Sequence, residues 1–181
     1  MVVSLTVLGI VMTIFTSAML QMYRVSNRSE ATANAQSQIN NLFLRLDKEI
    51  RYAAGISTPG TVGGDPYVEF LTTYTGTAVC TELRLRVSAK QLQRRTWTQG
   101  ASPLAPTAWV PLASEISSST PFSFIAADPT FNFQRLRLQL TATSGAGTTA
   151  TPKNTDVTFT AMNTSLTTSS ATVCNEGRTV P

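Results

Sequence analysis

The side chains that could carry acid–base chemistry in this chain are carboxylates, because its 181 residues include no histidine. Without histidine the chain lacks the commonest general base, every His-activated nucleophile and every His-ligated metal site. The carboxylates considered are Asp47, Glu49, Asp65, Glu69, Asp128 and Asp156. No pair has a spacing that requires a shared site. We therefore interpret them as solvated or salt-bridged surface groups, and expect no enzymatic activity and no cofactor.

Two further groups could hold a metal ion or form a covalent link. Residues 63–66 (Gly-Gly-Asp-Pro) could belong to a calcium loop, but they lack the run of alternating oxygen ligands that such loops need, so they predict a turn. The two cysteines, Cys80 and Cys174, cannot form a tetrahedral zinc site on their own. In an oxidising compartment they would form one disulfide; the alternative is two unrelated buried thiols. We expect the disulfide, because the apolar N-terminus described below indicates export.

Arginines are the third group with possible chemistry. Six of them fall on predicted strands: Arg84, Arg86, Arg94, Arg95, Arg135 and Arg137. If the strands pair, these side chains could form a basic face that binds a polyanion such as DNA through its phosphates. The alternative is a solvated sheet face, which we favour because only Trp97 among the aromatics is interleaved with them. The aromatics Trp97, Trp109, Phe122, Phe124, Phe131 and Phe133 are interpreted as core or interface anchors.

Composition points to one small domain outside the cytoplasm. Charged residues make up 13% of the chain, against about 25% in average globular proteins, and Thr and Ser are abundant. Without the N-terminal segments about 125 residues remain, enough for one domain. The net charge of +4 permits weak attraction to polyanions without demonstrating it.

The N-terminal segment is long and apolar enough to span a membrane. Residues 1–23 carry no charged side chain, and 1–20 are strongly apolar. A cleaved secretory signal would need a basic region before the apolar run, and this sequence shows none. The Ala33-Asn34-Ala35 pattern resembles a cleavage site but lies too far beyond the apolar run. A generic single-span anchor is a second interpretation. A third interpretation of the segment depends on the residues that follow it.

An amphipathic helical pattern continues past the apolar segment. Its apolar positions are Ile39, Leu42, Phe43, Leu46, Ile50 and Ala53, at the spacing of one helical stripe. Gly55 stands where a helix-ending glycine belongs, and Pro59 blocks continuation. The pattern therefore predicts one helix to Ala54, about 80 Å long. Five of these positions (Ile39, Leu42, Phe43, Leu46 and Ile50) should pack on the domain that follows.

This N-terminal half resembles the stem of type IV pilins and of type II secretion pseudopilins. The resemblance covers the first 57 residues well, is most specific in LFLRLDKEIRYAAGIS, and returns loosely in the C-terminal TDVTFTAMNT. Within the group the chain is most similar to the larger minor members, of the PilW or J-type pseudopilin kind. It departs from the family at position 5, where Leu5 stands and the mature family sequence has Glu, and no basic leader precedes Met1. We expect the true start to lie upstream.

The remainder of the chain predicts an antiparallel, strand-rich domain. The expected strands cover 67–74, 82–87, 91–98, 109–112, 121–125, 135–140 and 155–162, because apolar and polar residues alternate in them. Residues 144–152 predict a loop, and the polar tail from 164 to 181 predicts irregular structure pinned by Cys174. The expected fold class is α+β, a long helix packed on an antiparallel sheet, divided at 1–23, 24–57 and 58–181.

The resemblance implies a function as a non-catalytic structural subunit, a minor pilin or pseudopilin. Its implied partners are other subunits, reached through the N-terminal helix, and the lipid bilayer before assembly. A prepilin peptidase and an assembly platform join them if the start lies upstream. The domain would lie outside the cytoplasm, anchored by a single span. The alternative is a membrane-anchored extracytoplasmic binding domain, including a competence pilin that binds DNA.

Overall fold

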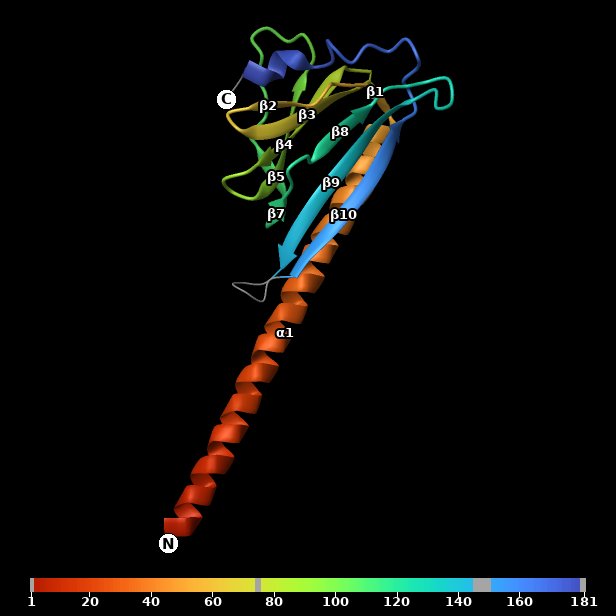
Figure 1. Cartoon of the computed structure of the whole chain (residues 1–181). Helices are drawn as coiled ribbons and strands as arrows, with labels where there is room; N and C mark the ends of the chain where they lie inside the picture. The colour runs from red at the N-terminus through yellow and green to blue at the C-terminus, as the bar shows by residue number, and fades with distance from the viewer. Residues whose placement is uncertain (1, 74–75, 145–150, 180–181) are drawn as a thin grey trace.

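The computed structural model describes residues 2–73, 76–144 and 151–179, and consists of a long helix that carries a β-rich domain at its C-terminal end (Figure 1). The helix is α1 (Val2–Arg51). The strands are β1 (Ala53–Ile56), β2 (Gly60–Val62), β3 (Asp65–Thr72), β4 (Val79–Arg86), β5 (Gln91–Thr98), β6 (Val110–Ser114), β7 (Ile116–Ser117), β8 (Phe122–Ile125), β9 (Gln134–Ser144) and β10 (Thr151–Ala161), and a short 3-10 helix, η2 (Asn175–Thr179), follows. The α+β class with an N-terminal apolar helix and antiparallel sheets is confirmed.

Two antiparallel sheets make up the domain. In the first, the strand order is β1-β3-β4-β5-β6, with β2 paired to β3; in the second it is β10-β9-β7, with β8 paired to β9. Every pairing among the described strands is antiparallel, and the β9–β10 hairpin is in continuous register from Gln134↔Ala161 to Ser144↔Thr151. Figure 1 shows β10 running along α1. Most of the predicted loop 144–152 lies outside the described residues.

The core lies between α1 and the two sheets. From the helix, Leu46 and Ile50 are completely buried, and Ile39 and Leu42 nearly so. Phe43 is partly buried and its ring centroid lies 6.1 Å from that of Phe159 on β10. The strands contribute the apolar side chains Val68, Phe70, Leu83, Leu85, Leu92, Leu136, Leu138 and Leu140. The helical stripe, with its 3.6-residue period, therefore lies against the domain.

The predicted end of the helix was wrong by three residues. α1 ends at Arg51, and residues 53–56 form β1, which pairs with β3. Gly55 is a strand residue opposite Leu71 and not a helix cap. A Cβ there would lie 2.9 Å from Cγ2 of Val173, so the glycine makes room for the C-terminal tail. Strand pairing and this tail contact outweigh the local stop signal.

The face of the first sheet that points away from α1 is largely covered, and not solvated as predicted. Alternation predicts a wet face, but Glu69, Glu82 and Arg95 are 0%, 3% and 3% exposed. The C-terminal tail covers them: Arg95 donates to the carbonyl of Gly177, and Arg178 contacts Glu69. The interpretation of Glu69 as a surface carboxylate was therefore wrong, because a segment distant in sequence covers this strand.

Candidate functional site

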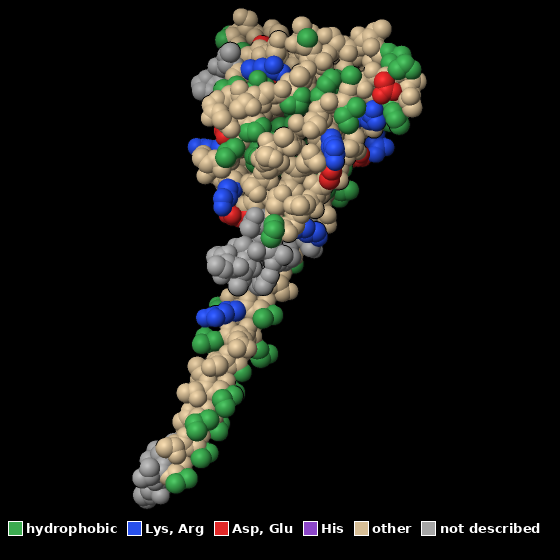
Figure 2. All heavy atoms as spheres, viewed as in Figure 1, with side chains coloured by type: hydrophobic (Ala, Val, Ile, Leu, Met, Phe, Trp, Pro, Cys, Tyr) green, Lys and Arg blue, Asp and Glu red, His purple; other side chains and the backbone are tan. Residues whose placement is uncertain are grey.

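The most conspicuous candidate site is the N-terminal part of α1, which no other described element covers. Residues Thr6–Asn27 form a helical stretch of 22 residues with mean hydropathy 1.5, none of it buried within the structure. Figure 2 shows its hydrophobic side chains along the protruding rod. The twelve large apolar side chains on it are 53–72% exposed: Val7, Leu8, Ile10, Val11, Met12, Ile14, Phe15, Met19, Leu20, Met22, Tyr23 and Val25. The helix is long and apolar enough to cross a membrane.

The threonine hydroxyls in this segment are bonded within the helix itself. The hydroxyls of Thr6, Thr13 and Thr16 donate to the carbonyls of Val3, Ile10 and Met12, each at 2.8 Å. A hydroxyl satisfied in this way costs little in an apolar medium, where an unpaired one would be expensive. The segment is therefore suited to lipid or to a protein core.

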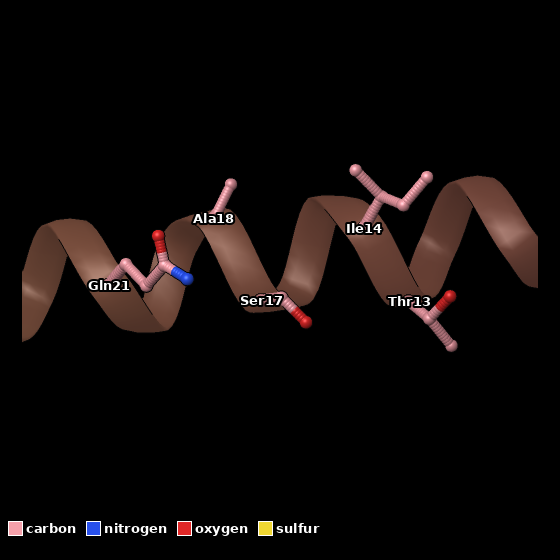
Figure 3. A pocket seen from close by; sticks show the side chains of 5 residues that line it. All are labelled: Thr13, Ile14, Ser17, Ala18 and Gln21. Atoms are coloured by element: carbon pink, nitrogen blue, oxygen red, sulfur yellow. The ribbon is translucent and has the colours of Figure 1, made fainter.

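A shallow hollow of about 340 Å³ lies along the same segment, lined by Thr13, Ile14, Ser17, Ala18 and Gln21. Figure 3 shows the side chains of Ile14 and Ala18 pointing to one side of the helix and those of Thr13 and Ser17 to the other. The hollow is a shallow depression on the surface of a single helix, which suits packing against another helix better than enclosing a small molecule.

The disulfide expected from the sequence is present. The sulfur atoms of Cys80 on β4 and Cys174 are 2.06 Å apart, and their Cα atoms 5.7 Å. Both cysteines are fully buried and cluster with Trp97 and Val173. The bond fastens the C-terminal tail to the first sheet.

Beneath this tail lies a buried ionic network. Glu69 accepts hydrogen bonds from Nε and Nη2 of Arg178, both at 2.9 Å, and from the hydroxyl of Ser57. Glu82 pairs with Arg95 at 2.6 Å. Burial raises the pKa of Glu82, and the hydrogen bond from Arg95 opposes that rise. Trp97 Nε1 donates to Glu176 at 3.1 Å. These groups hold the tail on the sheet.

The structure does not bring the six predicted arginines onto one basic face. Four lie in the first sheet, on β4 and β5, but Arg135 and Arg137 lie on β9 in the second. Four of the six form ion pairs: Arg94 with Glu49 at 3.1 Å, Arg95 with Glu82, Arg135 with Asp128 at 3.4 Å, and Arg137 with Asp156. Neighbouring carboxylates neutralise the charge of these four arginines, and the six do not share one sheet face.

The remaining carboxylates behave as surface groups. Asp47 pairs with Arg51 at 2.6 Å on the helix surface. Backbone N–H groups of Phe131 and Thr130 lower the pKa of Asp128, and the Arg137 hydrogen bond lowers that of Asp156. Gly63 and Gly64 form the β2–β3 turn, and Asp65 and Pro66 begin β3. Within the described ranges, no three or more of the Cys, Asp and Glu side chains are placed to hold a metal ion together.

Most of the aromatic side chains lie where a core or interface anchor is expected. Trp97 and Phe122 are buried, and Trp109, Phe124 and Phe133 are partly buried. Phe131 is 52% exposed and is not a core residue; its ring lies 4.2 Å from the guanidinium of Arg135. Arg178 was not predicted as a site residue, because no sequence pattern in a polar tail indicates which arginine will pack over a strand.

Comparison with known proteins identifies no relative: no protein-family model, no curated protein and no solved structure matches this chain.

Proposed function

We propose that this protein is a non-catalytic structural subunit, a minor pilin or pseudopilin, of a type IV pilus-like or type II secretion filament. One observation supports this most directly. A single continuous helix buries the stripe of its second half in its own domain, while its first half exposes apolar side chains on all sides. The stem resemblance of residues 1–57 supports the same assignment.

The cost of exposing apolar side chains to water supports this proposal. Burying a large apolar side chain contributes about 1.5–3 kcal/mol, so twelve such side chains left in water would exceed the stability of an ordinary domain. Lipid can cover them before assembly, and the same segments of neighbouring subunits can cover them within a filament. Assembly then exchanges lipid contacts for helix–helix contacts, and an external assembly machine supplies the extraction work.

We place the domain outside the cytoplasm. A buried disulfide persists in oxidising compartments and is rare in the cytosol. Arg24 lies near the domain-side end of the stretch Thr6–Asn27 and Arg28 directly follows it, and basic residues by themselves favour the cytoplasmic side. The disulfide is the stronger criterion, because it reports on the compartment in which the domain folds.

The rival function is a single-span anchor for a separate binding domain. In that case lipid alone would cover the apolar half of α1 throughout the life of the protein. Contact between this half and other protein chains separates the two functions.

Complementation of a gene deletion tests the proposal. Deletion should reduce surface filaments or the export of a secreted substrate, and the wild-type gene should restore it. Ile14→Asp, at a 64% exposed position in the apolar half, should not restore it. Leu166→Asp, 55% exposed on the domain, is the matched control and should restore it. Full restoration by Ile14→Asp at normal protein level would contradict a role of this helix in assembly.

A further inference from the structure

A second candidate site lies on the domain, far from the membrane-spanning part of α1. A surface hollow of about 610 Å³ opens between the β2–β3 turn, the end of β4 and the residue before β6. We call it the arginine hollow. The residues used below that line it are Asp65, Arg84, Arg86, Ser88 and Trp109.

Two buried hydrogen-bond donors at this hollow have no acceptor. Nε of Arg84 and Nε1 of Trp109 are buried without a hydrogen-bond partner within the described part of the chain. The same guanidinium donates from Nη2 to Gln93 at 2.8 Å and lies 3.8 Å from the centre of the Trp109 ring. Buried donors are nearly always satisfied, so two orphaned ones beside one hollow point to an acceptor that comes from outside the chain.

Charge at the hollow points to an anion. Of the six strand arginines, Arg84 and Arg86 are the two that have no carboxylate partner among the described residues, and both line this hollow. Asp65 is the single carboxylate in the lining, and it accepts a hydrogen bond from the backbone N–H of Val87 at 2.9 Å. Two guanidinium groups against one carboxylate leave one net positive charge.

We propose that the arginine hollow binds a monoanionic carboxylate, presented by an acidic side chain or by the C-terminus of a peptide. A planar carboxylate can accept two parallel hydrogen bonds from one guanidinium, and Arg86 beside it adds a second positive charge. Since Nε of Arg84 is buried beside Trp109, binding requires the indole ring to move aside. Trp109 lies in the segment that enters β6 and not within a strand, so this movement breaks no strand pairing.

The site goes beyond a structural role in a filament, and it does not depend on that role. Peptide carboxylates are abundant on exported proteins and on neighbouring subunits. Either would give the domain a specific contact that the apolar helix does not supply.

Peptide titration of the purified full-length chain in detergent tests this site. The probes are three short peptides: one with an aspartate and an amidated C-terminus, one neutral with a free C-terminus, and one neutral and amidated. We expect saturable binding of the first or the second, which distinguishes the two sources of the carboxylate, and a change in tryptophan fluorescence that Trp109→Phe abolishes. The third peptide should not bind.

Variants assign the binding to the arginines. Arg86→Gln, at an exposed side chain, and Arg84→Gln should each weaken binding about tenfold or more, the loss expected for a charge-assisted hydrogen bond. Arg137→Gln, on the other sheet, is the matched control and should bind as wild type. Thermal unfolding establishes that each variant is folded. Equal binding by wild type and Arg86→Gln, or no saturable binding of either carboxylate peptide, would overturn the proposal. Binding of duplex DNA with neither peptide bound would also overturn it and would indicate a phosphate site.

Discussion

Truncation of Leu46 to alanine measures how much the helical stripe stabilises the domain. Leu46 is fully buried between α1 and the sheets, so Leu46→Ala removes apolar contacts and leaves a cavity that the surrounding side chains fill only in part. Substitutions of this kind cost about 2–5 kcal/mol. The unfolding free energy of a domain is about 5–15 kcal/mol, so this cost is a large fraction of it. A loss of about 3 kcal/mol lowers the thermal midpoint by roughly 10 °C.

The same helix supplies a matched control. Leu44 lies two residues away and is 74% exposed, so Leu44→Ala should change the unfolding free energy by less than about 0.5 kcal/mol. The assay is urea unfolding of the full-length chain in detergent, followed by the fluorescence of Trp97 and Trp109 in the domain. An Leu46→Ala midpoint equal to wild type, or an equal loss in both variants, would refute the division of α1 into a packed and a free half.

Three further predictions address the span, the disulfide and a surface ion pair. Val11→Asp, at a 56% exposed position, should leave the domain folded but reduce retention in the membrane fraction, since a central aspartate costs about 2.5–3.5 kcal/mol on insertion; unchanged retention would count against a membrane span. Thiol labelling of the denatured, unreduced protein should find no free cysteine, and reduction should remove up to roughly 4–5 kcal/mol of stability for a separation of 94 residues; two labelled thiols would exclude the bond. Because the pKa of Asp156 lies below its ordinary value of 3.8, its ion pair stabilises the fold above that pH, and this contribution is lost as the pH falls through the folded-state pKa. The gap in thermal midpoint between wild type and Asp156→Asn should therefore close on acidification, and a constant gap down to about pH 2 would contradict the assignment.

The long helix could be predicted because its signal repeats over many turns. The apolar run and the stripe from Ile39 to Ile50 each contain enough residues to specify a face, and both lie where the pattern indicates. The end of the helix is a local choice between Gly55 as a cap and 53–56 as a strand. Pairing with β3 decided it, and that pairing depends on tertiary structure.

The buried ionic network and the separation of the arginines could not be predicted from the sequence. Alternation correctly indicates that Arg84 and Arg137 lie on strands, but it does not say that β4 and β9 belong to different sheets. Glu69 is buried because Arg178, 109 residues further on, closes over it. The one sequence signal for this closure was Cys174, which ties the tail to β4.

The proposed function requires contact between the apolar half of α1 and other subunits, and cross-linking in cells tests this contact most directly. Ile14→Cys would carry the reactive thiol, because Cys80 and Cys174 are bonded to each other. The matched control is Leu166→Cys, at a 55% exposed position on the domain surface. The cross-linker is a membrane-permeant bismaleimide. We predict that the Ile14→Cys chain forms a covalent dimer only when the assembly machinery is present. Its partner is a second copy of the chain or a neighbouring subunit with a cysteine in its own apolar helix. An Ile14→Cys chain that stays monomeric under those conditions, while its thiol remains reactive from the lipid phase, would contradict the proposal that this helix builds a filament.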